Sequence, residues 1–177
     1  MKATKIFTVL FLTLSLGSCK KEENKPEEAE VTNIYTFTLN AVVKQDDDFQ
    51  IFYKEDNNPE TPYEELSSIW TGVKGVETAQ DIVFVLPEDV IPTQLRFDFG
   101  QNKRQPEIVV NSFKVAFRDK SFSVSGKDFF KYFIPDENFV KVDAEASKVI
   151  PVSTGTTYDP MFFSTADFNT EMAKISQ

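Results

Sequence analysis

The sequence predicts an all-β protein, an antiparallel β-sandwich with a short C-terminal helix. Three observations predict this fold. Apolar and polar residues alternate with a period of two in several segments, β-branched and aromatic residues fill those segments, and Pro, Gly and Asn separate them. The chain of 177 residues also contains 18 phenylalanines, which favour one sizeable core. The short spacing between the segments favours a sandwich over alternating strands and helices.

The first strands have the clearest pattern. Across residues 35–43 the odd positions are apolar and most even positions are polar, as in a strand with one buried face. Asp46, Asp47 and Asp48 predict a turn, and residues 49–53 predict a second strand. We expect further strands at residues 69–73, 81–86, 94–99, 107–117 and 121–124.

The C-terminal third has a less regular pattern. Residues 127–133 fit either one helical turn or a short strand, and residues 140–142 and 148–150 predict a hairpin. Ser164 and Thr165 offer N-cap oxygens, and Asp167 places an acid in the first turn of a helix from 166 to about 175. The sandwich is therefore expected over residues 32–163 and a helical tail over 164–177.

The N-terminus has the pattern of an export signal. Two lysines precede an apolar run at residues 6–16, which is long enough for a signal peptide and too short to span a bilayer. The run ends in L-S-L-G-S-C, which resembles the bacterial lipobox. The resemblance implies that residues 1–18 are a lipoprotein signal peptide and that Cys19 receives a diacylglycerol. The alternative is an ordinary secretory signal with a cysteine nearby.

Residues 19–31 are rich in charge, which predicts a disordered tether between the lipid and the domain. The stretch Cys19, Lys20, Lys21, Glu22 and Glu23 resembles the surface-export signal of Bacteroidetes-type lipoproteins. This resemblance implies an outer-membrane lipoprotein that faces the cell exterior. A plain tether on the periplasmic face is the alternative.

Composition excludes several classes of function. The net charge of −9 opposes binding to nucleic acid, and the single cysteine excludes a disulfide framework. The chain has no histidine, so Ser-His-Asp catalysis and histidine-ligated metals are excluded. We expect a protein that is not an enzyme and that binds no cofactor and no metal. A glycosidase using two carboxylates is the remaining catalytic option, but pairs such as Glu64 and Glu65 are expected in solvated turns.

One acidic loop has to be weighed as a calcium site. Residues 55–60 are rich in Asp, Asn and Glu, whose oxygens suit calcium. The loop lacks the glycine and the closing glutamate of an EF-hand, and Asp, Asn and Pro together are typical of a plain turn. We predict a turn.

The aromatic residues suggest a ligand site. An indole or phenol ring can stack on a sugar while its polar edge stays in water, so Trp70, Tyr53 and Tyr63 are candidate platforms. Alternation points Ile69 toward the core and Trp70 away from it. The alternative is that Trp70 packs under a loop.

Two charges on one strand complete the candidate site. Leu95, Phe97 and Phe99 alternate with Arg96 and Asp98, so the two charged side chains share a face. They could bind the hydroxyls of a sugar or pair with charged groups on neighbouring strands. We expect weak glycan binding at Trp70, Tyr53 or Tyr63 together with Arg96 and Asp98.

Four segments carry a family resemblance. The strings D-D-D-F-Q-I-F-Y, V-F-V-L-P, L-R-F-D-F-G and I-V-V-N-S-F resemble β-sandwich modules of the galactose-binding, jelly-roll kind. The resemblance covers residues 34–124 and implies carbohydrate binding on a sheet face or in end loops. It also allows an inert spacer. A structural or adhesin-type subunit that binds envelope proteins is therefore the alternative to a glycan-binding lipoprotein.

Overall fold

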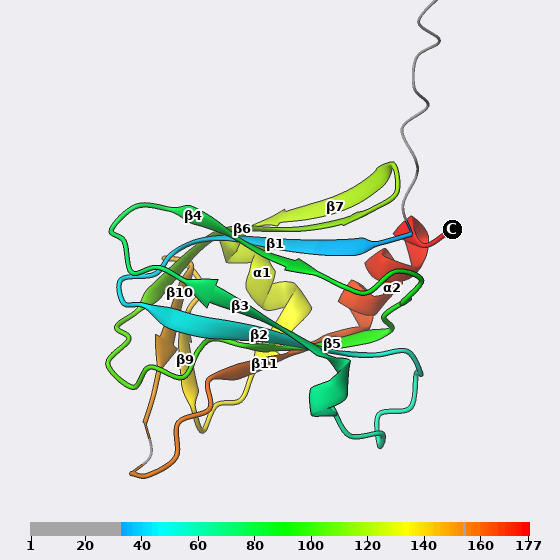
Figure 1. Cartoon of the computed structure of the whole chain (residues 1–177). Coiled ribbons are helices and arrows are strands. Elements are labelled where there is room, and N and C mark those ends of the chain that lie inside the picture. Colours follow the sequence, from blue (N-terminus) through cyan, green and yellow to red (C-terminus); the bar gives the residue numbers. More distant parts are fainter. Residues whose placement is uncertain (1–32, 154) are drawn as a thin grey trace, which may run out of the picture. The chain divides into compact units, whose positions relative to one another are not determined.

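The computed structural model describes residues 33–153 and 155–177 (Figure 1). The predicted signal peptide, the predicted lipidation site Cys19, the export-like residues Lys20 to Glu23 and the predicted tether lie outside these residues. Two antiparallel sheets pack face to face, so the prediction of a β-sandwich with a C-terminal helix is confirmed. The jelly-roll type stays a prediction.

The first sheet has six strands in the order β4-β1-β6-β10-β9, and β7 pairs with β6. The long strand β6 pairs with β10 near its start and with β7 near its end, and its pairing with β1 has a register shift beside Asn40. The strands of this first sheet are β1 (Tyr35–Val42), β4 (Gln80–Val85), β6 (Ile108–Phe117), β7 (Lys120–Ser125), β9 (Val140–Asp143) and β10 (Lys148–Pro151).

The second sheet has five strands in the order β3-β2-β5-β11-β8. Its strand β2 starts at Asp47, so the turn predicted at residues 46–48 is wrong for Asp47 and Asp48, and the chain turns between Val42 and Asp47. Its strands are β2 (Asp47–Lys54), β3 (Ser68–Val73), β5 (Gln94–Asp98), β8 (Phe133–Pro135) and β11 (Met161–Ser164).

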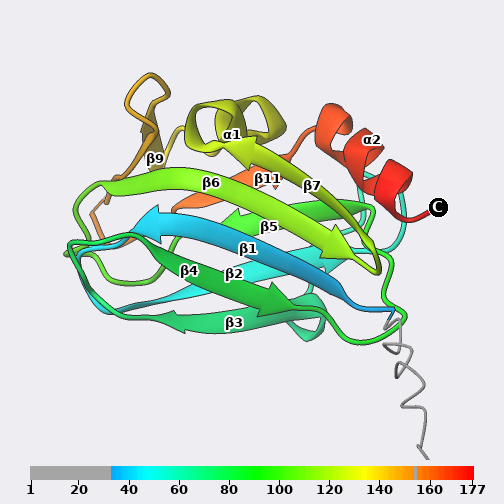
Figure 2. The ribbon, with the colours of Figure 1, turned by 90° about the horizontal axis from the view of Figure 1, so that it is seen from above.

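Three helical segments complete the domain, namely η1 (Glu65–Ser67), α1 (Gly126–Tyr132) and α2 (Ala166–Ile175). The segment at 127–133 is a helix that runs directly into β8, which resolves the two alternatives. Helix α2 begins where predicted, because the hydroxyl of Thr165 accepts a hydrogen bond from the backbone N–H of Phe168. Helices α1 and α2 lie along the side of the sandwich near β7 and β11 (Figure 2).

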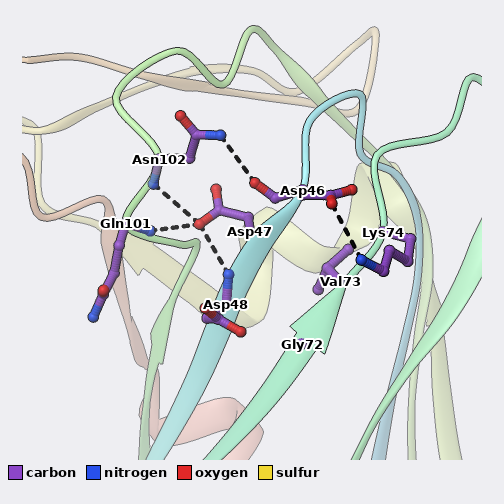
Figure 3. A pocket seen from close by; sticks show the side chains of 8 residues that line it. All are labelled: Asp46, Asp47, Asp48, Gly72, Val73, Lys74, Gln101 and Asn102. Atoms are coloured by element: carbon purple, nitrogen blue, oxygen red, sulfur yellow. Dashed lines mark hydrogen bonds and ion pairs between the residues drawn. The ribbon is translucent and has the colours of Figure 1, made fainter.

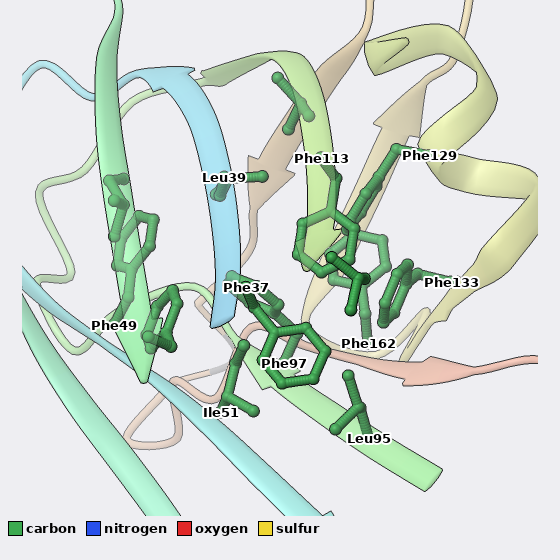
Figure 4. Close-up of a cluster of buried hydrophobic side chains, with 14 of the residues drawn as sticks. Phe37, Leu39, Phe49, Ile51, Leu95, Phe97, Phe113, Phe129, Phe133 and Phe162 are labelled. Atoms are coloured by element: carbon green, nitrogen blue, oxygen red, sulfur yellow. The ribbon is translucent and has the colours of Figure 1, made fainter. Parts of the chain in front are cut away.

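The core consists largely of phenylalanine rings that meet between the two sheets (Figure 4). Phe97 of β5 and Phe113 of β6 contact each other edge to face across the sandwich. Phe129 of α1 packs on both of them, so this helix closes the gap between the sheets. Each buried phenylalanine stabilises the fold by about 1.5–3 kcal/mol through burial of apolar surface.

The edges of the two sheets meet on the other side of the sandwich. Strands β3 and β4 lie side by side, and the hydroxyl of Thr71 donates a hydrogen bond of 2.8 Å to the carbonyl of Val83. Both edge strands are short, and this contact occupies one acceptor of the β4 edge. Among the described residues, no helix combines the length and the apolar character needed to cross a membrane.

Candidate functional site

The candidate site lies on the outer face of the second sheet. Strand pairing places Gln50 of β2 between Trp70 of β3 and Asp98 of β5. The next outward row contains Ser68, Phe52 and Arg96 on the same three strands. Successive side chains of a strand alternate between its faces, so all of these residues point away from the core.

These side chains, apart from that of Ser68, form the floor of an open pocket of about 370 Å³. Glu65 of η1 lines one part of it, while Gln101, Tyr158 and Asp159 line it from loops. The predicted residues Trp70, Arg96 and Asp98 all line this pocket. Gln50, Phe52 and Gly100 complete its lining. The sheet therefore brings Trp70 of β3 into the same pocket as the two charged side chains that the sequence places together on β5.

Trp70 is 44% exposed, and the neighbouring Ile69 packs against the core, so the predicted outward orientation is confirmed. The indole Nε1 donates a hydrogen bond of 2.9 Å to Oε1 of Glu65. The side-chain amide of Gln50 donates to the same oxygen at 3.0 Å. Glu65 therefore holds the polar edge of the indole in place while a large part of the ring stays open to a ligand.

Arg96 and Asp98 form a two-point ion pair along β5. Nε of Arg96 donates to Oδ1 of Asp98 at 2.8 Å, and Nη2 donates to Oδ2 at 2.5 Å. The guanidinium also lies over the ring of Phe52, with 4.0 Å from Cζ to the ring centroid. The pair is thus fixed in orientation, and several guanidinium N–H groups remain outside the bonds to Asp98.

The electrostatic balance of the pocket is negative. Burial raises the pKa of Asp98 above its usual range, Arg96 opposes this rise, and the carboxylates of Asp159 and Glu65 add to it. Three carboxylates thus surround one guanidinium. A ligand without negative charge suits this pocket better than an anion.

The two candidate tyrosines have different positions. Tyr63 lies on the outer face, where its ring packs on Phe52 and Phe163 and lies 6.0 Å from the Arg96 guanidinium. Burial raises the pKa of Tyr63 to about 12, with Arg96 acting against the rise. Tyr63 supports Arg96 from outside the pocket, since it is not one of the lining residues.

The structure corrects the predicted site at Tyr53. It lies on the core side of β2, in phase with Phe49 and Ile51, and is only 8% exposed. Its ring therefore cannot share a face with Trp70, and we leave Tyr53 out of the binding platform.

A second open pocket of about 560 Å³ lies where β2 begins (Figure 3). Its walls come from Asp46 to Asp48, from the end of β3 and from Gln101 and Asn102. The buried carboxylate of Asp47 accepts hydrogen bonds from the backbone N–H groups of Gln101 and Asn102, at 2.7 and 3.0 Å. Nζ of Lys74 lies 3.2 Å from Oδ2 of Asp46.

The acidic loop after β2 forms a turn, as predicted. The carboxylate of Asp56 accepts from the backbone N–H of Asn58 and from the hydroxyl of Thr61, at 3.2 and 2.8 Å. In the part of the chain that the structure describes, no cluster of three or more carboxylates has the geometry of a metal site.

Several pocket residues were not predicted. Gln50 could have been found from the pattern, because it alternates with the core residues Phe49 and Ile51. Glu65 was expected to be solvated, and only the fold of the 55–67 segment brings it to Trp70. Tyr158 and Asp159 reach the pocket from the loop before β11, which no local pattern indicates.

No protein-family model, no curated protein and no solved structure matches the chain.

Proposed function

We propose that this protein is a membrane-anchored lipoprotein whose sandwich domain binds glycans at the cell surface without catalysing a reaction. One observation carries the proposal: a half-exposed indole and a fixed Arg96–Asp98 pair line the same pocket of about 370 Å³, with Gln50 between them. Sugars combine apolar C–H faces with rims of hydroxyl groups, and this site offers a partner for each.

Each group has a definite role in this proposal. The ring of Trp70 stacks on one sugar, which contributes on the order of 1 kcal/mol beyond the burial of area. The free N–H groups of Arg96 donate to sugar oxygens, and the carboxylate of Asp98 accepts from hydroxyls. One such contact set supports weak affinity, in the millimolar to high micromolar range.

Binding without catalysis fits the arrangement of the carboxylates. A glycosidase needs one protonated carboxyl group that can donate to the leaving oxygen. In this pocket both oxygens of Asp98 are bonded to Arg96, and Glu65 accepts from Trp70 and Gln50. Proton transfer from either group would require these contacts to break.

The membrane part of the proposal rests on the lipobox-like sequence that ends at Cys19 and on the export-like stretch that follows. Changing Cys19→Ala should release the protein from the membrane fraction or stall its processing. Replacing Lys20, Lys21, Glu22 and Glu23 by alanine should reduce cleavage by external protease while membrane attachment persists. Wild-type anchoring of the first variant would contradict the lipid anchor, and unchanged cleavage of the second would favour a periplasmic tether.

The binding test is a glycan-array screen of the purified full chain, followed by titration of Trp70→Ala with the glycan that binds. We expect at least a tenfold loss of affinity with an unchanged melting temperature. Trp70→Phe should retain part of the affinity, because it keeps an aromatic face, although this face is smaller and lacks the indole N–H. Ile134→Ala, at an exposed position outside the pocket, is the control. A large drop in stability of Trp70→Ala would show that Trp70 is a structural residue.

A protein-binding role is the second candidate, and one observation favours it. Leu66 of η1 is 94% exposed beside Glu65. An adhesin-type subunit would bury this side chain against an envelope protein. A pull-down from the native envelope, compared between the wild type and Leu66→Ser, tests this role.

A further inference from the structure

The pocket at Trp70 and the pocket at Asp46 are neighbours on one sheet face. Gln101 lines both. On β3, Gly72 follows Trp70 by two residues on the same face, and on β2 their partners are Asp48 and Gln50. Two residues of strand span about 7 Å, which is comparable with the width of one sugar ring. The pockets therefore follow each other along the strands as one trough.

Gly72 keeps the floor of this trough open. A Cβ atom at Gly72 would have only Oδ1 of Asp48 within 4 Å, at an ordinary contact distance of 3.4 Å. Neither the backbone conformation nor the packing requires a glycine here. The missing side chain instead leaves room for a ligand between Trp70 and the second pocket.

The wall of the second pocket is rigidly held. The carboxylate of Asp47 fixes the loop at Gln101 and Asn102 through their backbone N–H groups, and the side chain of Gln105 donates to its other oxygen at 3.2 Å. The side-chain amide of Asn102 in turn donates to the carbonyl of Asp46 at 2.9 Å. A wall ordered before binding loses little entropy when a ligand arrives.

The net charge along the trough is negative. Carboxylates outnumber cations in both pockets, because Lys74 and Arg96 are the two cations among the lining residues of the trough. The carboxylates are those of Asp46, Asp47, Asp48, Glu65, Asp98 and Asp159. A trough of this sign repels acidic ligands and accepts neutral or amino-bearing ones.

We propose that the ligand is an oligosaccharide of at least two units without acidic groups, which runs along β2 and β3 from Trp70 across Gly72 to the pocket at Asp46 and Lys74. This inference rests on the proposed glycan-binding function and specifies its substrate class. Trp70 binds the first ring, and the polar groups beyond Gly72 bind the second.

The test uses the full chain in detergent and three sets of probes. Neutral cello-, manno- and malto-oligosaccharides of increasing length measure the gain from a second unit, deacetylated chito-oligosaccharides supply a cationic chain, and oligogalacturonates supply an anionic one. We expect at least a tenfold gain in affinity between one unit and two or three units in one neutral series, and no binding of oligogalacturonates. The cationic chain should bind at least as well as a neutral one.

Gly72→Val fills the trough and isolates the second pocket. Valine is favoured in strands, so the melting temperature should stay within a few degrees of wild type. Binding of the longer probes should fall to the level of the single sugar, while binding of the single sugar persists. Gly72→Ala should give a smaller loss, and Trp70→Ala should weaken probes of every length.

The possible failures are distinct. Equal affinity for one and several units, or an undiminished gain in Gly72→Val, would overturn the extended trough and leave the Trp70 pocket intact. Preferred binding of oligogalacturonates would overturn the charge selection. Absence of binding by every probe would overturn both this inference and the proposed glycan-binding function.

Discussion

The carboxylate of Asp47 organises the loop after β5. It accepts hydrogen bonds from the backbone N–H groups of Asp48, Gln101 and Asn102 and from the side chain of Gln105. Gly100 precedes the donors Gln101 and Asn102 with a φ of 96° and lies directly against the carboxylate. A buried carboxylate with this many donors is stable only if the chain comes this close, and glycine permits the approach.

Gly100→Ala should therefore destabilise the domain by about 2 kcal/mol or more. A Cβ atom at this position would clash with the carboxylate of Asp47, and the positive φ would add strain. Thermal unfolding should show a melting temperature lower by several degrees. Gly72→Ala is the matched control, since its Cβ would make only an ordinary contact of 3.4 Å with Oδ1 of Asp48. Equal stability of the two variants would contradict this explanation.

A second prediction concerns the pH dependence of stability at Asp98. Burial, with help from Asp159 and Glu65, raises the pKa of Asp98 above its ordinary value of 3.8 despite the ion pair with Arg96. The folded protein therefore binds a proton at Asp98 at a pH where the unfolded chain has released it. The stability due to this proton is complete below pH 3.8 and is lost as the pH rises through the raised pKa.

Melting curves of the wild type and Asp98→Asn across this acidic range measure the effect. Other carboxylates titrate in both proteins, so the difference between the two melting temperatures reports on Asp98. We expect this difference to shift against the wild type as the pH rises from 3.8 through the raised pKa. Parallel profiles would show that the pKa of Asp98 is the same in the folded and unfolded protein.

At the level of elements, the sequence predicts the strands and helices whose own side chains define a buried face. Strand β1 follows the period of two with every odd residue buried, and α2 starts at the predicted cap. Strands β8 and β11 were not predicted, because they are three and four residues long and depend on pairing with each other and with β5. Long-range pairing leaves no local pattern in such short strands.

Long-range strand pairing also limits how much of the site the sequence predicts. Alternation places Trp70, Arg96 and Asp98 outward on their own strands, which the structure confirms. That they meet in one pocket follows from the pairing of β2 with both β3 and β5, which the sequence does not reveal. The prediction of Tyr53 as a platform is wrong, because Tyr53 is in phase with Ile51 and its ring faces the core.

Helix α1 allows a test of how much a single element contributes to the stability of the core. Phe129 contacts Phe113 of the first sheet and Phe97 of the second. Phe129→Ala should cost about 3–5 kcal/mol, because it leaves a cavity where helix and sheets meet. Phe130→Ala, at the adjacent half-buried position, should cost clearly less in denaturant titration. Equal costs would mean that α1 is only peripheral to the core.

On the scale of the whole domain, one apolar cluster joins every layer. It includes residues of both sheets and of both α-helices, from Tyr35 of β1 to Ile175 of α2. The described residues of the domain also form one compact unit. A fold with a single shared core has no part that is stable alone.

A fragment of residues 31–177 should therefore unfold in one cooperative step. Calorimetry should give equal calorimetric and van't Hoff enthalpies, and the transition should coincide with loss of the strand signal in circular dichroism. Phe129→Ala should move the whole transition and keep its shape. Two separate transitions would show that the helical side and the sheets form independent units.

Trp70 is the only tryptophan of the chain, and it lies in the proposed binding pocket. Excitation at the red edge of protein absorption therefore selects one indole, whose emission reports on one place in the molecule. Stacking of a sugar would remove water from this ring and shift its emission toward the blue. The protein thus contains its own optical probe, and a ligand can be sought with the unlabelled wild-type chain.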